Sequence, residues 1–374
     1  MIEWMNDPPP AVAESMIAML RRAAEASPSS RAIRVELAQL LERQARFSES
    51  SEIWRALLSE PPDDLDMRLK LASALERLGA LDEALASLEG AGEDDALDSM
   101  RLRLLAIARR WNDAARLVEE RGDDHFHAGA MLKYLGARPG APDPATMLAL
   151  ADRILAKNPG NAGVLYQQAV ALAKLGRTAE AREAIGADRF VEVRQLPHDQ
   201  GPAFTTVLRD EILRNDTLRP DPLENTTRQG RQSRILVRKG DVATVALCEH
   251  IRAAVDDYAA RLAGDHPFVR GRPARATLEA WAVVYGKDGH QGPHRHPSGW
   301  LSGVYFVSGD GASPAPLRIG VPDENGVDTC GEERQVMPLP GRIVLFPSAV
   351  THATVPASSA DTRIVVAFDV VAMP

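Results

Sequence analysis

The sequence predicts a chain of two parts, an all-α domain over residues 12–187 followed by a β-rich domain over residues 188–374. Two observations predict this division. Ala, Leu, Arg and Glu recur with helical spacing in the first part, whereas the second contains short runs of β-branched and aromatic residues separated by Gly and Pro. The 374 residues are enough for two or three domains. The predicted fold class is therefore α+β multidomain.

The composition excludes several classes of protein. The chain is 45% hydrophobic and 26% charged, as is usual for a soluble globular protein. Its net charge of −8 argues against a nucleic-acid or anionic membrane partner, and it has no apolar run long enough for a membrane-spanning helix. The first ten residues lack the basic and apolar segments of a secretory signal, and Cys248 and Cys330 lie too far apart to suggest a disulfide scaffold. We therefore expect a cytoplasmic protein.

A repeat of 34 residues runs through the N-terminal part. The segment LERQARFSES at residues 41–50 recurs as LERLGALDEA at residues 75–84, with related patterns at residues 105–114 and 172–181. About five units fit, and the one at residues 131–159 is irregular. This period resembles the tetratricopeptide repeat, whose helix pairs stack into a solenoid with a peptide-binding groove. The resemblance implies a peptide or protein partner, while dimerisation of the chain and support of the second domain remain open as alternative roles.

The C-terminal part begins with a predicted strand and two predicted helices. The polar stretch at residues 220–234 separates these helices, and the Arg-rich residues 228–238 are expected to form a solvated loop. Short strands with such frequent turns favour an antiparallel barrel or sandwich. The expected elements are a strand at 190–194, helices at 205–214 and 242–262, and strands at 278–285, 301–307, 317–320, 342–346 and 363–371.

Four of the nine histidines lie after residue 289. His294 and His296 are two residues apart, so on an extended chain their side chains leave the same face. His352 stands 56 residues later, after an apolar run that a barrel can bring beside the first pair. We expect these three imidazoles to bind one metal ion. His290, in the same loop, competes for a place in this set.

Four motifs follow one another in a recognisable order. They are HRHP at residues 294–297, SGVYF at 302–306, GRIVLFPSAVTH at 341–352, and Arg363, preceded by TTRQGRQS at 226–233. Together they closely resemble a bacterial 2OG-Fe(II) oxygenase family within the iron(II)/2-oxoglutarate-dependent oxygenases, over about residues 190–374. The resemblance implies a double-stranded β-helix, or jelly roll, with flanking helices.

The resemblance also implies roles for individual residues. His294 and His352 would bind Fe(II), and the remaining open positions would take 2-oxoglutarate and O2. Arg363 would form a charge-assisted fork with the distal carboxylate of 2-oxoglutarate. Tyr305 could donate its hydroxyl to the same carboxylate, and Tyr285 is a weaker candidate for contact with this cosubstrate.

One position departs from the usual pattern. The acidic ligand that is usual among the iron(II)/2-oxoglutarate-dependent oxygenases is replaced by His296, so a set of three imidazoles carries one negative charge less. This could alter the affinity for 2-oxoglutarate or favour another divalent metal. We interpret it as a variant metal site in which either His296 or His290 completes the triad. His290 could alternatively lie behind the ligands or on the substrate side.

Several residues near the expected site have two readings. Trp300 and Trp281 lie near its mouth, where either could stack on a substrate, with packing favoured for Trp281. Arg363 could instead pair with a carboxylate such as Asp361.

We therefore expect an Fe(II)- and 2-oxoglutarate-dependent hydroxylase that acts on a peptide or protein side chain recruited by the repeats. One alternative is a non-catalytic adaptor, in which the β-rich domain only holds a metal or senses a ligand. Another is a cupin-like dioxygenase with three His ligands and no need for 2-oxoglutarate.

Overall fold

The computed structural model describes most of the chain and divides it into two compact units. The described residues are 2–4, 10–61, 64–92, 94–108, 110, 113, 116–117, 143–196, 201–220, 226–308, 315–323, 326–356 and 362–373. Residues 7–142 form one unit, and residues 1–6 form the other together with residues 143–374. No described helix is long and apolar enough to cross a membrane.

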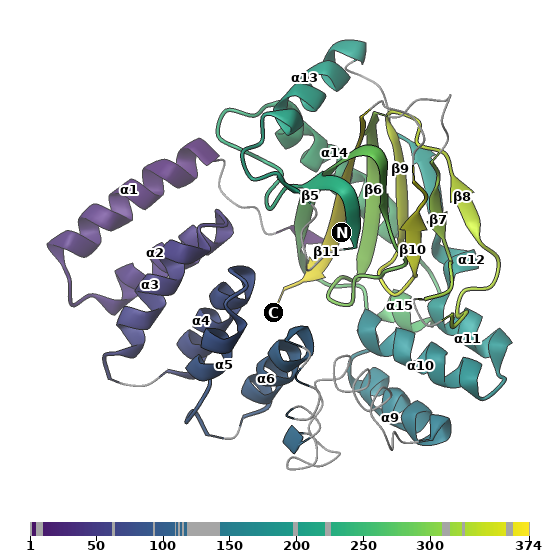
Figure 1. Ribbon diagram of the computed structural model, residues 1–374, viewed down its shortest axis with the longest axis horizontal. Helices are drawn as coiled ribbons and strands as arrows, with labels where there is room; N and C mark the ends of the chain where they lie inside the picture. The colour runs from purple at the N-terminus through teal and green to yellow at the C-terminus, as the bar shows by residue number, and fades with distance from the viewer. Residues whose placement is uncertain are drawn as a thin grey trace. The chain divides into compact units, whose positions relative to one another are not determined.

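The first unit consists of helices that pack against their neighbours in sequence (Figure 1). These are α1 (Pro10–Ala26), α2 (Arg31–Arg43), α3 (Phe47–Leu58), α4 (Leu65–Arg77), α5 (Leu81–Ser87) and α6 (Asp95–Ile107). Ala45 between α2 and α3 and Gly79 between α4 and α5 both have positive φ, at 54° and 75°. These two left-handed turns lie one repeat apart, as the sequence pattern predicts, and they let each helix fold back on the one before. Of the irregular unit expected at residues 131–159, residues 131–142 lie outside the described residues.

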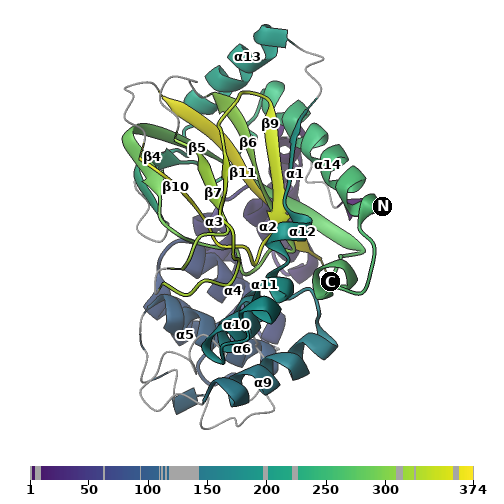
Figure 2. The ribbon, with the colours of Figure 1, turned by 90° about the vertical axis from the view of Figure 1, so that its right-hand side faces the viewer.

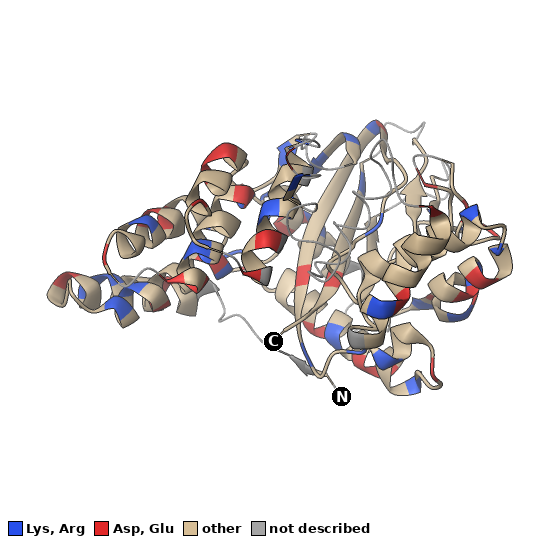
Figure 3. Cartoon of the chain, turned by 90° about the horizontal axis from the view of Figure 1, so that it is seen from below, with Lys and Arg blue, Asp and Glu red and all other residues tan. Residues whose placement is uncertain are grey.

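Surface charges are interspersed along the helices rather than collected by sign (Figure 3). Arg34 of α2, for example, reaches Glu60 just after α3 with both guanidinium nitrogens at 2.7 Å. Such exposed pairs contribute little to stability but fix the orientation of long side chains.

The second unit is built on a large antiparallel sheet. Its strand order is β2-β9-β6-β11-β5-β4-β3, and β1 (Glu3–Trp4) adds in parallel to β5. The strands are β2 (Glu192–Gln195), β9 (Arg342–Pro347), β6 (Leu301–Ser308), β11 (Arg363–Ala372), β5 (Arg275–Gln291), β4 (Thr227–Gln232) and β3 (Arg219–Pro220). A smaller antiparallel sheet has the order β10-β7-β8, with β10 (His352–Thr354), β7 (Leu317–Ile319) and β8 (Arg334–Val336).

One face of the large sheet is covered by helices. Helix α14 (Ala243–Arg261), together with α13 (Gly201–Leu213), contacts β5 and β6, and their apolar side chains form one core with alternate residues of the strands. On β11, Ile364, Val366 and Phe368 face this core. The other face of the large sheet is turned toward the smaller sheet (Figure 2). The unit therefore has one apolar face closed by helices and one face free to form a site between two sheets.

Helices α9 (Pro144–Lys157), α10 (Ala162–Lys174), α11 (Thr178–Ile185) and α12 (Ala187–Phe190) belong to this second unit. The sequence pattern places the first three with the repeats, but the compact unit begins at Asp143 rather than at residue 188.

The backbones of Gly160 and Gly271 approach so closely that a Cβ on Gly271 would lie 2.1 Å from the Gly160 Cα. Only glycine fits at such a contact.

The expected elements of the β-rich part are largely present, with three differences. Phe190 ends the short helix α12, so the strand expected at residues 190–194 begins two residues later. The polar stretch contains a strand, β4, which pairs with β5. Strand β5 continues past Tyr285 to Gln291, and this extension carries the chain directly to the histidine segment.

Candidate metal centre

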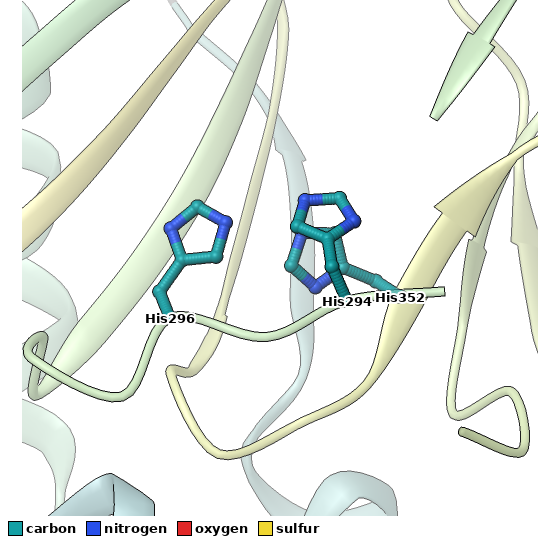
Figure 4. Close-up of side chains that lie close together, drawn as sticks. All are labelled: His294, His296 and His352. Atoms are coloured by element: carbon teal, nitrogen blue, oxygen red, sulfur yellow. The ribbon is translucent and has the colours of Figure 1, made fainter. Parts of the chain in front are cut away.

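Three histidines meet at one end of the second unit. One ligand atom from each of His294, His296 and His352 lies within 4.8 Å of the others. The ring centroids are 4.2 Å apart for His294 and His352, and 5.3 and 5.1 Å from each of these to His296. Figure 4 shows the three rings gathered over the loop that carries His294 and His296. The spacing is suitable for three imidazoles to bind one divalent ion.

Backbone hydrogen bonds bring these distant residues together. The amide of His294 donates to the His352 carbonyl at 3.0 Å, and the amide of His352 donates back at 2.9 Å. The amide of His296 donates to the carbonyl of Ser348, in the turn after β9. The two segments therefore form a short antiparallel pair, which places their side chains side by side.

Hydrogen bonds at Nδ1 determine which ring nitrogens are available. Nδ1 of His294 lies 2.9 Å from the Gly292 carbonyl, and Nδ1 of His352 lies 3.1 Å from the Val350 carbonyl. Nδ1 of His296 lies 2.7 Å from a carboxylate oxygen of Asp369. Because each Nδ1 has an acceptor, we assign its proton there, which leaves the lone pair of each Nε2 free for a metal ion.

The environment keeps two of the rings neutral. Burial lowers the pKa of His294 to about 3, and the nearby charge of His296 adds to this effect. Burial, followed by the charges of the other two histidines, also lowers the pKa of His352 well below its usual value. For His296 burial alone would lower the pKa, but the charge and hydrogen bond of Asp369 outweigh it and raise the pKa. Neutral imidazoles are the form that binds metal ions.

Asp369 is a residue that the sequence analysis missed. It lies on β11 directly opposite Ser302 of β6, whose hydroxyl donates to the carboxylate at 2.6 Å. Ser302 in turn lies 2.7 Å from the hydroxyl of Ser348. Asp369 has the same strand parity as Arg363, and it is an acidic residue in an otherwise apolar strand interior. That combination is the signal that could have found it.

Arg363 is buried in the same pocket as the three histidines. It is 5% exposed and donates to the carbonyls of Ala315 at 2.6 Å and Gly289 at 3.2 Å. Its Nε is buried without a hydrogen-bond partner, and it forms no ion pair with any carboxylate in the described part of the chain, which does not include Asp361. Burial lowers the pKa of Arg363. A buried guanidinium without a counter-charge favours an anionic ligand.

Tyr285 connects this arginine to the edge of the sheet. The guanidinium lies 4.3 Å from the centre of the Tyr285 ring, and the Tyr285 hydroxyl donates to the Gln291 side chain at 2.9 Å. Burial raises the pKa of Tyr285 to about 12, so the hydroxyl stays protonated. The Gln291 amide also donates to the hydroxyl of Thr227 on β4. The polar segment that the family resemblance singled out thus supports one wall of the pocket.

Three other candidates lie away from the pocket. The expected role of Tyr305 is not supported, because side chains alternate along β6 and Tyr305 faces the core under the helices. Trp300 is also a core residue, 3% exposed and stacked on Phe268, and its indole nitrogen donates to the Phe268 carbonyl. His290 lies outside the three-histidine cluster, and its Nδ1 is close to the carbonyl of Asp288. The geometry therefore favours His296 over His290 as the third ligand.

Trp281, for which the sequence favours packing, is the tryptophan that lies at the pocket. It lines the pocket and stacks on His296, with ring centroids 5.6 Å apart and planes 22° apart. Its indole nitrogen is buried without a hydrogen-bond partner among the described residues. Trp281 thus forms the wall beside the third histidine.

Helix α10 contacts the loop between the two histidines. The guanidinium of Arg295 lies 3.6 Å from the centre of the Tyr166 ring. The hydroxyl of Tyr166, itself buried, donates to Asp323 at 2.5 Å. This cation–π contact holds the histidine loop against helix α10.

Comparison with known proteins agrees with this site. Residues 279–369 match the model of the family described as "Putative 2OG-Fe(II) oxygenase". The match includes all three histidines, Arg363 and Asp369. No curated protein matches the chain.

The solved structures that partly match the chain include oxygenases and a repeat protein. A prolyl-4-hydroxylase from Pseudomonas putida is 18% identical with a TM-score of 0.36, and the alignment covers 52% of this chain and 99% of that one. HygX from Streptomyces hygroscopicus, with nickel, 2-oxoglutarate and hygromycin B bound, is 15% identical with a TM-score of 0.36, over 49% and 83% of the two chains. A tetratricopeptide repeat protein from Parabacteroides merdae is 17% identical with a TM-score of 0.36, over 46% and 71%. These TM-scores are below 0.5, so we base no argument on them.

Proposed function

We propose that the chain is an Fe(II)- and 2-oxoglutarate-dependent oxygenase. One observation carries this proposal: the same pocket is lined by three imidazoles with free Nε2 atoms and by a buried arginine that has no carboxylate partner among the described residues. The family match of residues 279–369 supports the choice of iron and 2-oxoglutarate. The two facing sheets fit the double-stranded β-helix expected from the sequence.

The three histidines and Arg363 would each hold one component of the reaction. His294, His296 and His352 would hold Fe(II) from one side, because their hydrogen bonds at Nδ1 fix the rings in place. When bound, Fe(II) and 2-oxoglutarate supply the activation of O2, with conversion of 2-oxoglutarate to succinate and CO2. Arg363 would bind the distal carboxylate of 2-oxoglutarate.

The rest of the pocket orients the cosubstrate and excludes water. Tyr285 limits the movement of the Arg363 guanidinium, while Gln291 holds the tyrosine hydroxyl. Phe346, Val365 and Leu317 line the pocket with apolar surface. Apolar walls strengthen the attraction between a guanidinium and a carboxylate, because they lower the local dielectric.

Within this proposal, the reaction is hydroxylation of a peptide or protein side chain. The support is the 34-residue helical repeat, since such helix pairs commonly bind peptides.

Succinate formation tests the proposal. The purified chain is incubated with Fe(II), ascorbate and 2-oxoglutarate, and succinate is measured together with metal-dependent binding of 2-oxoglutarate. We expect both signals in the parent protein and neither in His352→Ala. The absence of both signals from the parent protein would refute the proposal. Consumption of O2 that needs no added 2-oxoglutarate and is unchanged in Arg363→Ala would instead favour a three-histidine dioxygenase that uses no 2-oxoglutarate.

A further inference from the structure

The carboxylate of Asp369 is held in one orientation behind His296. Its two oxygens lie 2.7 and 2.8 Å from Nδ1 of His296. The residue is 9% exposed, and Ser302, which donates to the same carboxylate, is 1% exposed. A carboxylate with two donors in a buried position has little freedom to turn away.

The direction of these hydrogen bonds follows from the groups involved. An ionised carboxylate can only accept, so the single hydroxyl hydrogen of Ser302 is directed to Asp369. Ser302 must then accept from Ser348, which lies 2.7 Å away. The chain of bonds therefore runs from Ser348 through Ser302 to Asp369, and every donor stabilises the negative charge on the carboxylate.

Among the described residues, the negative charge of Asp369 has no partner of opposite charge other than His296. No Lys or Arg in the described part of the chain lies within ion-pair distance of Asp369. A buried carboxylate is costly unless a positive charge lies close by. A divalent ion on Nε2 of His296 would supply that positive charge through the imidazole ring.

We propose that Asp369 is a positioning residue that fixes the His296 ring for metal binding and restores the negative charge absent from the three-histidine ligand set. This inference rests on the proposed metal centre. The carboxylate thus lies behind the third histidine, with the imidazole ring between it and the proposed metal position. The alternative is a simple ion pair, in which protonated His296 carries hydrogen on both ring nitrogens and binds no metal.

Metal affinity distinguishes these two roles. The full-length chain is freed of metal with a chelator and titrated with Ni(II) by calorimetry, and separately with Co(II) by visible absorption. We expect Asp369→Asn to weaken Ni(II) binding by about 10- to 100-fold and to shift the Co(II) absorption bands. Asp369→Glu, which keeps the charge, should recover part of the affinity. Ser302→Ala keeps the carboxylate but removes one of its donors, so it should cause a smaller loss.

Glu279 provides a matched control. It lies opposite Asp369 on β5, is exposed, and makes no contact with His296. Glu279→Gln should bind Ni(II) as the parent does.

Parent affinity or tighter binding in Asp369→Asn would overturn the inference and favour the ion pair. If Asp369→Asn does not fold, parent affinity in Ser302→Ala would overturn it in the same way. A parent protein that binds neither ion would refute the metal centre itself, and this inference with it.

Discussion

Replacement of Arg363 by Met should weaken the binding of 2-oxoglutarate while the stability of the folded protein changes little. The buried guanidinium makes two hydrogen bonds to carbonyls, and its Nε has no hydrogen-bond partner in the part of the chain that the structure describes. A hydrogen bond between charged groups is worth about 1.5–3 kcal/mol, so loss of one such bond to 2-oxoglutarate should weaken binding about 10- to 100-fold. Stability should change little, because removal of an unpaired buried charge is favourable while loss of the carbonyl contacts is unfavourable.

Calorimetry with Ni(II) in place of Fe(II) measures the affinity for 2-oxoglutarate. A thermal melt supplies the second readout, because a ligand that binds only the folded state raises its melting temperature. We expect 2-oxoglutarate to raise the melting temperature of the parent protein and to have almost no effect on Arg363→Met. Without 2-oxoglutarate, the two proteins should melt at similar temperatures.

Arg318→Met serves as the control. Arg318 lies on β7 and pairs with Glu333 rather than with a pocket residue. This variant should bind 2-oxoglutarate as the parent does. The reasoning is refuted if Arg363→Met binds Ni(II) and 2-oxoglutarate with parent affinity, since the buried guanidinium would then have no part in cosubstrate binding.

Three further substitutions test the fold around the site. Gly303→Ala would place a Cβ 2.2 Å from the Phe368 ring, so we expect the unfolding free energy, measured by urea titration, to fall by about 1–3 kcal/mol. Gly292→Ala is the control, because a Cβ there would meet open space and should leave the stability unchanged. Equal effects of the two substitutions would contradict the packing argument. Tyr166→Phe removes a hydroxyl that donates to a buried carboxylate, and we expect a loss of about 1–3 kcal/mol; an unchanged urea midpoint would show that this hydrogen bond adds nothing. Burial lowers the pKa of His266 in the folded state, so the unfolded state binds protons more readily and stability should fall as the pH drops below about 6.5. His266→Asn should reduce the difference between urea midpoints at pH 7.5 and 5.5, and an undiminished difference would exclude this histidine as a cause.

The histidine cluster could be predicted because short sequence segments are enough to indicate the positions of its three residues. The spacing of His294 and His296 and the motif that ends in His352 each specify a position at a strand end. The third ligand could not be chosen from sequence, because His290 lies in the same loop. The choice depends on where β5 ends, since its extension to Gln291 keeps His290 close to its own backbone and away from the cluster.

The errors concern which face of a strand a residue occupies. Tyr305 lies on a strand that is buried on both faces, so its hydrophobic pattern shows no alternation from which to read a direction. The parity becomes clear only from the pairing of β6 with β11, where Ser302 and Asp369 are directly opposite. Asp369 was missed for the same reason.

Strand β4 could not be predicted from the sequence for a different reason. Its sequence TRQGRQ is polar on both faces and contains Gly230, so neither composition nor alternation predicts a strand. Pairing with β5 makes it one. A Cβ on Gly230 would lie 3.0 Å from the Thr227 side chain and 3.3 Å from the Val284 carbonyl oxygen, so a larger residue would be crowded there.

The reciprocal amide bonds of His294 and His352 also bear on how the centre assembles. Closure of a chain segment this long lowers the entropy, and the two backbone hydrogen bonds offset part of that loss without a contribution from the histidine side chains. The spacing of these two histidines is therefore set by peptide geometry. Discrimination among divalent ions would then follow their intrinsic preference for imidazole nitrogen, in the Irving–Williams order, rather than any adjustment of the protein around them.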